Sequence, residues 1–134
     1  MRQTRTKECD RAFAAARLEQ AFSFAEHATL DPYSKHGPSR STAVSNAVLA
    51  GIAASDVICC RVLGKRSASW DHRDALRLLR SVPDIGKEAE FRLRVLLTIK
   101  DKAQYHRDDP NMTDTKRSIR AMEVIIDLAR SCLQ

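Results

Sequence analysis

The segment from Ala43 to Gly64, AVSNAVLAGIAASDVICCRVLG, determines the fold class that we expect. Its apolar and small residues recur every three or four positions, as on one face of a helix. The positions on this line are Val44, Val48, Ile52, Ser55, Cys59 and Val62. Ser55 therefore falls on the buried line, with Asp56 beside it. The pattern predicts the central helix of a helical bundle, ending at Gly64.

The same stretch is also the best candidate for a membrane span in the sequence. Polar residues interrupt it, and an aspartate near the middle of a lone span, here Asp56, is costly in a bilayer. The N-terminal residues MRQTRTKECDR are followed by no apolar run, so no signal peptide is expected. We therefore expect a cytoplasmic protein without a membrane partner.

Four further helices are expected, because apolar residues recur at helical spacing on both sides of this segment. The first runs from about Thr6 to Thr29 and is followed by the loop DPYSKHGPSR, whose prolines and glycine interrupt helical structure. Ser39 or Ser41 is the expected N-cap of the central helix. The others are a short helix at about Asp71–Ser81, a fourth that begins after Asp84 and a fifth that begins near Thr113 or Asp114.

No segment shows the alternation typical of β-strands, and no repeats occur. The sequence therefore predicts an all-α protein, an antiparallel up-and-down bundle of four long helices plus one short helix. Its 134 residues, 43% of them hydrophobic, suffice for one core, so a single domain covering residues 1–134 is expected.

The net charge of +6 permits an anionic partner such as RNA, although such a charge also serves solubility. The positive charge is concentrated between Arg61 and Arg80, where six Lys or Arg residues face two acidic residues. This segment is therefore a candidate surface for binding an anionic ligand.

The four cysteines do not resemble a disulfide framework. Cys59 and Cys60 are adjacent in an apolar run, whereas Cys9 and Cys132 lie near opposite ends of the chain. We expect buried free thiols in a reducing compartment. The spacing of the histidines and cysteines suggests no metal site, and no cofactor is expected.

The segment KDKAQYHRDD, Lys100 to Asp109, closes the fourth helix. Lys100 interrupts the apolar line one step after Leu96, which is costly unless the amine reaches water or pairs with a carboxylate. The lysine could extend along the helix end to solvent. Alternatively, it could lie in a cleft and face Ser55 or Asp56 of the central helix.

His106 follows Lys100 by six residues, about 9 Å along the axis if the helix continues. A histidine and a fixed cation around one phosphate suit RNA cleavage without a metal, because the histidine transfers protons and the cation stabilises developing charge. Tyr105 could hydrogen-bond a phosphate or stack on a base, or simply pack the helix end. His72 and Arg73 could receive phosphate at a helix start, or form a solvated first turn.

Together these features resemble the HEPN (higher eukaryote and prokaryote nucleotide-binding) domains, over about Phe13 to Cys132. AVSNAVLAGIAASDVICCRVLG resembles the small-residue second helix of that family, and DHRDALRLLR its following short helix. LLTIKDKAQYH falls where the family has its signature, an Arg, four to six residues often beginning with a polar one, and a His. Asp101 matches the polar position and His106 the His, but Lys100 stands in place of the Arg.

The resemblance implies a metal-independent endoribonuclease, commonly part of a toxin–antitoxin or defence system, with the site at a homodimer interface. In that reading His106 is the acid/base, Lys100 the phosphate-stabilising cation, and Asp56 orients one of them. Lysine keeps the charge but lacks the planar fork of arginine, and many relatives with altered signatures act as binding modules. The sequence therefore predicts a module that binds RNA, a nucleotide or a partner protein such as a cognate antitoxin, with the active ribonuclease as the alternative.

Overall fold

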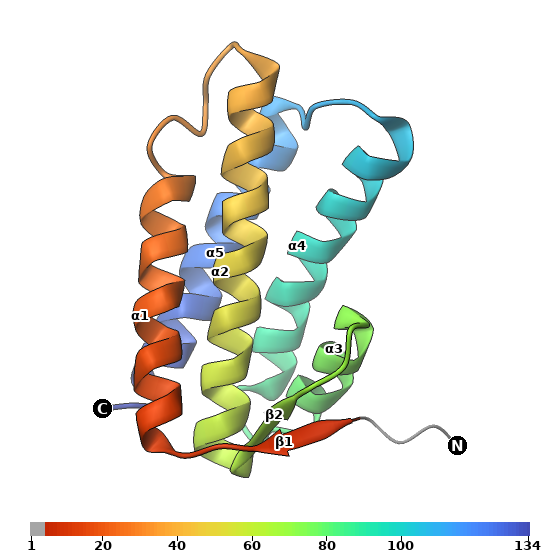
Figure 1. Ribbon diagram of the computed structural model, residues 1–134. Helices are drawn as coiled ribbons and strands as arrows, with labels where there is room; N and C mark the ends of the chain where they lie inside the picture. Colours follow the sequence, from red (N-terminus) through yellow and green to blue (C-terminus); the bar gives the residue numbers. More distant parts are fainter. Residues whose placement is uncertain (1–4) are drawn as a thin grey trace.

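The computed structural model describes residues 5–134, which form five helices and a two-stranded sheet (Figure 1). The helices are α1 (Arg11–Ala28), α2 (Gly37–Leu63), α3 (His72–Arg80), α4 (Gly86–His106) and α5 (Met112–Ser131). The strands are β1 (Thr6–Glu8) and β2 (Lys65–Ser67). The prediction of a mainly α-helical fold with four long helices and one short helix is confirmed.

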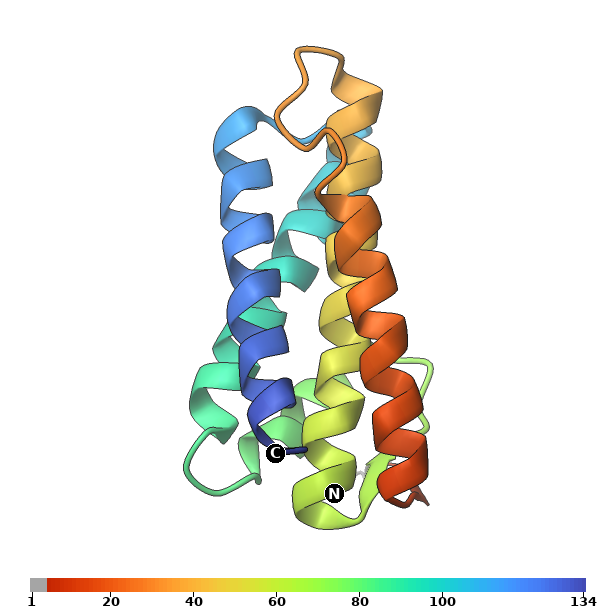
Figure 2. The same ribbon diagram turned by 90° about the vertical axis from the view of Figure 1, so that its left-hand side faces the viewer.

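The four long helices lie side by side in alternating directions, and α3 packs against the first half of α4 near one end of the bundle (Figures 1 and 2). Helix α2 contacts each of the other four helices. Every residue from Ala53 to Cys60 is buried, because neighbours surround this part of α2 on all sides. By length and composition α2 could cross a membrane, but 72% of that apolar window is buried inside the bundle.

Gly51 allows α2 and α4 to approach closely. A β-carbon at this position would lie 2.5 Å from a side-chain carbon of Leu96, well inside van der Waals contact. Glycine therefore sets the spacing of the two helices that form the walls of the cleft described below.

The expected start of the first helix at Thr6 and the expected absence of strands were wrong. Thr6–Glu8 pairs antiparallel with Lys65–Ser67, in the register Thr6 with Ser67. Helix α1 begins only at Arg11, because the side chain of Asp10 caps it by accepting a hydrogen bond from a first-turn backbone N–H. Strand β2 follows directly after the left-handed Gly64, which reverses the chain at the end of α2.

Two other helix starts also differ from the prediction. Helix α2 begins after His36 rather than Ser39 or Ser41, with proline in its first turn. Helix α4 begins after Ile85 rather than Asp84, which instead adopts a positive φ of 65° in the preceding turn.

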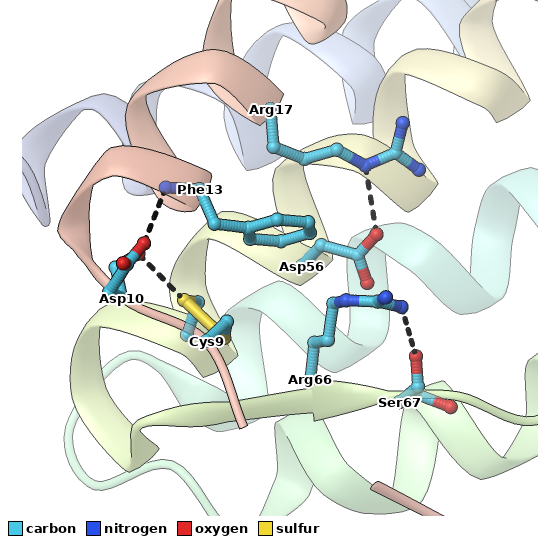
Figure 3. The surroundings of a disulfide bond; sticks show 8 residues. Cys9, Asp10, Phe13, Arg17, Asp56, Arg66 and Ser67 are labelled. Carbon is cyan, nitrogen blue, oxygen red and sulfur yellow. Dashed lines mark hydrogen bonds and ion pairs between the residues drawn. A yellow bond between two sulfur atoms is a disulfide. The ribbon is translucent and has the colours of Figure 1, made fainter. Parts of the chain in front are cut away.

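A disulfide joins Cys9 and Cys60, whose Cα atoms are 5.7 Å apart (Figure 3). The prediction of four free thiols was therefore wrong for this pair. The two residues are separated by 51 positions and meet because β1 folds back beside the end of α2. Cys59 and Cys132 are free, and burial raises the pKa of the Cys59 thiol to about 12, so it stays protonated at neutral pH.

Candidate functional site

A cleft of about 660 Å³ lies between α2 and α4, with residues from α1 and α3 at one end. Its apolar wall consists of α2 side chains at helical spacing: Val44, Val48, Leu49 and Ile52. Leu49 is 44% exposed, so part of this apolar wall faces solvent in the unliganded chain. The cleft extends from Ser41 to Ile52, which is about 16 Å along a helix axis.

Three basic side chains from three helices meet at the Ile52 end of the cleft. They are Arg17 of α1, His72 of α3 and Lys100 of α4. Helix α3 places His72 there because Asp71 caps the start of the helix. The Asp71 side chain accepts a hydrogen bond of 3.0 Å from the backbone N–H of Arg73. Lys100 reaches the cleft because it continues the line of α4 residues that face α2.

The pKa of His72 is lowered from its usual 6.5 by partial burial and then by the positive charge of Lys100. His72 is therefore neutral at pH 7 and lies within electrostatic range of Lys100. No residue among 5–134 forms an ion pair with Lys100 within 4 Å, whereas other cations of the bundle are paired. The amine of Lys100 is thus available to an anionic ligand.

Arg17 forms an ion pair with Asp56 of α2. Its Nε donates to Asp56 Oδ2 at 2.9 Å, and Arg66 lies on the other side of the carboxylate (Figure 3). Burial raises the pKa of Asp56 despite the opposing charges of Arg17, Arg66 and His72. Asp56 itself does not line the cleft, whereas Arg17, to which it is bonded, does.

The opposite end of the cleft is acidic and polar. It is lined by Ser41, Gln104, Arg107, Asp108 and Asp109. Helix α4 ends there because Arg107 adopts a left-handed conformation with φ of 56°. The cleft therefore carries positive charge at one end, an apolar wall along its length, and hydrogen-bond acceptors at the other end.

His106 does not share this cleft within one chain. It lines an adjoining depression of about 450 Å³ on the α5 side. This depression shares Ala103, Asp108, Asp109 and Pro110 with the cleft, and in it Lys102 pairs with Asp114 at 3.1 Å. Six helical residues rotate a side chain by about 600°, so His106 points about 120° away from Lys100. Tyr105 is 84% exposed and its ring makes an edge contact with that of His106.

The other predicted site residues are distributed as follows. Ser55 is buried beneath the cleft, where it hydrogen-bonds the Cys59 thiol. Arg73 and Asp101 are exposed and line a third depression with His72 and Lys100. Arg73 is engaged by Asp71, which it contacts at 3.1 Å. The structure thus brings Lys100 and His72 into one cleft, places His106 in the adjoining depression, and leaves Tyr105 outside both.

Arg17 was missed by the sequence reasoning. It falls between Ala14 and Ala21 on the inward side of α1, directly before the buried Leu18. A charged residue at a buried register is the same signal that identified Lys100, and it could have identified Arg17 as well. Among residues 5–134, no group of three or more His, Cys, Asp or Glu side chains is placed to hold a metal ion.

Fold and cleft together define a mainly α-helical chain with an apolar groove that is cationic at one end. Neither a family model, nor a curated protein, nor a solved structure matches the chain.

Proposed function

We propose that the chain is a HEPN-like module that binds a phosphate-bearing ligand, a nucleotide or RNA, in the cleft between α2 and α4. The observation that carries this proposal is the meeting of Arg17, His72 and Lys100 at one end of an apolar groove. Two of these groups carry fixed positive charge, and Lys100 forms no ion pair within 4 Å with any residue of the described range 5–134. A phosphate bound there would replace water with charge-assisted hydrogen bonds.

The rest of the cleft fits the remainder of a nucleotide. The apolar wall formed by Val44, Val48 and Ile52 offers a surface for a base. Asp108 and Asp109 at the far end can accept hydrogen bonds from ribose hydroxyls or exocyclic amino groups. The length of about 16 Å accommodates base, sugar and phosphate in line.

Cleavage is the second candidate function, and His72 favours it. A metal-independent endoribonuclease needs an acid/base beside a phosphate-binding cation, and His72 is neutral at pH 7 next to Lys100. His106 could take that role only in a homodimer that brings it from a second chain. The HEPN-like proposal includes such a homodimer and a cognate antitoxin or other partner. It also includes a cytoplasmic location, which the Cys9–Cys60 disulfide does not favour, because such bonds are rare in reducing compartments.

Binding is tested by titrating the protein with adenosine and guanosine monophosphates and following the heat of binding. Lys100→Gln is expected to weaken binding by roughly 10- to 150-fold, the effect of losing a charged hydrogen bond of about 1.5–3 kcal/mol. Lys87→Gln is the matched control, since it removes the same charge from the same helix at an exposed position that lines neither the cleft nor the depression of His106. Equal losses in both variants would show that only net charge attracts the ligand.

Cleavage is tested in parallel with labelled RNA in the presence of EDTA. If the cleft is catalytic, His72→Ala abolishes product while His106→Ala does not. If the site is completed across a homodimer, His106→Ala abolishes it instead. Equal product from both variants and the wild type would assign the cleavage to a contaminant.

A further inference from the structure

Trp70, the single tryptophan of the chain, lies in the segment between β2 and α3 and is 95% exposed. Tryptophan is normally well buried, because its ring contributes a large apolar area to a core. An indole held almost entirely in water stabilises the fold little. Its position on the surface therefore calls for a role in binding.

The surroundings of Trp70 are cationic. It lines a depression of about 520 Å³ between α3 and α4, together with Arg73, Arg94 and Lys100. The acidic groups there are Asp71, which engages Arg73, and Asp101. Arg94 is paired at 3.2 Å with Glu90 but keeps about half of its side chain exposed. An aromatic ring beside basic side chains suits a base and its phosphate.

This depression adjoins the cleft between α2 and α4. Lys100 and His72 line both, so they form the shared wall between them. A ligand that spans the two must place a negative group over this wall. The phosphodiester that links two consecutive nucleotides is such a group.

We propose that Trp70 stacks on a base of a single-stranded nucleic acid, with the neighbouring nucleotide in the α2–α4 cleft and the connecting phosphate over Lys100 and His72. The inference rests on the proposed function and specifies its ligand as a strand of at least two nucleotides. The interior of a duplex does not fit, since its bases are stacked on one another and present no free face to the indole. The apolar residues beside Trp70, Leu76 and Leu97, are largely covered, so the depression lacks the broad apolar patch that a protein partner would bury.

The test uses the fluorescence of the lone tryptophan in the complete chain. Single-stranded RNA and DNA tetranucleotides are expected to quench it. A long, stably paired duplex at the same nucleotide concentration is expected to quench it far less, because only its few end pairs have a free face. Trp70→Ala should weaken tetranucleotide binding by about 5- to 150-fold, corresponding to roughly 1–3 kcal/mol for one stacked base, measured by calorimetry. Trp70→Phe should retain most of the affinity, because it preserves a stacking surface. Tighter binding of the RNA than of the DNA strand would assign the site to RNA. Equal binding of the two would show that the site accepts either strand through stacking and phosphate contacts.

Tyr105→Ala provides the control. It also removes an exposed aromatic ring, but Tyr105 lies on α4 and lines neither the α2–α4 cleft nor the depression of Trp70. Mononucleotide affinity should be the same in Trp70→Ala and the wild type. If mononucleotides and tetranucleotides bind equally well in both proteins, the inference about Trp70 is overturned while the cleft remains a nucleotide site. If neither ligand binds the wild type, the proposed function itself fails.

Discussion

Removing the Cys9–Cys60 disulfide should lower the free energy of unfolding by about 4 kcal/mol. The bond closes a loop with a sequence separation of 51 residues. In the chain-entropy model, a loop of this length removes about 14 cal/mol/K from the unfolded ensemble, or about 4 kcal/mol at 25 °C. For a chain of 134 residues this corresponds to a fall of roughly 10–20 °C in Tm.

Cys9→Ser is the appropriate variant, because Cys9 is only partly buried and a serine hydroxyl there can reach water. Cys60 is buried at the end of α2, and a serine at that position would add the burial of a polar group to the loss of the bond. Cys132→Ser is the matched control. It removes a free, partly buried thiol that donates to the Leu128 carbonyl, a contact that serine can also make.

The assay is thermal and urea unfolding followed by circular dichroism, with and without reductant. Thiol titration in denaturant should find two reactive cysteines in the oxidised chain and four after reduction. Reductant should lower the Tm of the wild type and of Cys132→Ser to the value of Cys9→Ser, which itself should not respond. A wild type that holds the bond yet melts at the same temperature after reduction would refute the loop-entropy reasoning.

Three further predictions concern the cleft. The affinity for a dinucleotide without a terminal phosphate should rise as pH falls below 6.5, because His72 then gains a positive charge, and His72→Asn should abolish this rise. Burial raises the pKa of Asp56 above 3.8, so the native state keeps the Asp56 proton to higher pH than the unfolded state does. The free energy of unfolding should therefore decrease as pH rises through the range just above 3.8. Urea unfolding should show no such decrease from this group in Asp56→Asn. Gly51→Ala should cost at most about 2 kcal/mol. Its methyl group displaces the end of the buried Leu96 side chain, at roughly 1–3 kcal/mol, while alanine is favoured over glycine in a helix by about 1 kcal/mol; urea unfolding measures the net change.

The helical pattern was predictable because periodicity is a local property of the chain. The α2 line correctly predicted a core helix, although Val62 at its end is 45% exposed. Lys100, a charged residue at a buried register, was expected either to extend to solvent or to lie in a cleft, and it lines the cleft. The strand at Thr6–Glu8 was not predictable by the same means. Three residues carry too little alternation to be recognised as a strand. They adopt the strand conformation because they pair with a segment nearly sixty residues away in the sequence.

In the candidate site, too, features within one helix were predictable from the sequence, whereas contacts between helices were not. Spacing along one helix suggested that Lys100 and His106 act together, but rotation about the axis separates them. The actual neighbours of Lys100 are Arg17 and His72, which come from other helices and depend on how those helices pack. Sequence spacing alone carries no information about such neighbours. The cysteine pairing was missed for the same reason.

The disulfide also gives the chain an unusual covalent topology. Residues 9 to 60 form a closed ring that contains α1, the connecting loop and most of α2. The loop exposes Leu30 and Tyr33, which are preferred cleavage sites for chymotrypsin-like proteases. A single cut there would open the ring without releasing a fragment, so the nicked protein would migrate as one species until reductant separates it into two.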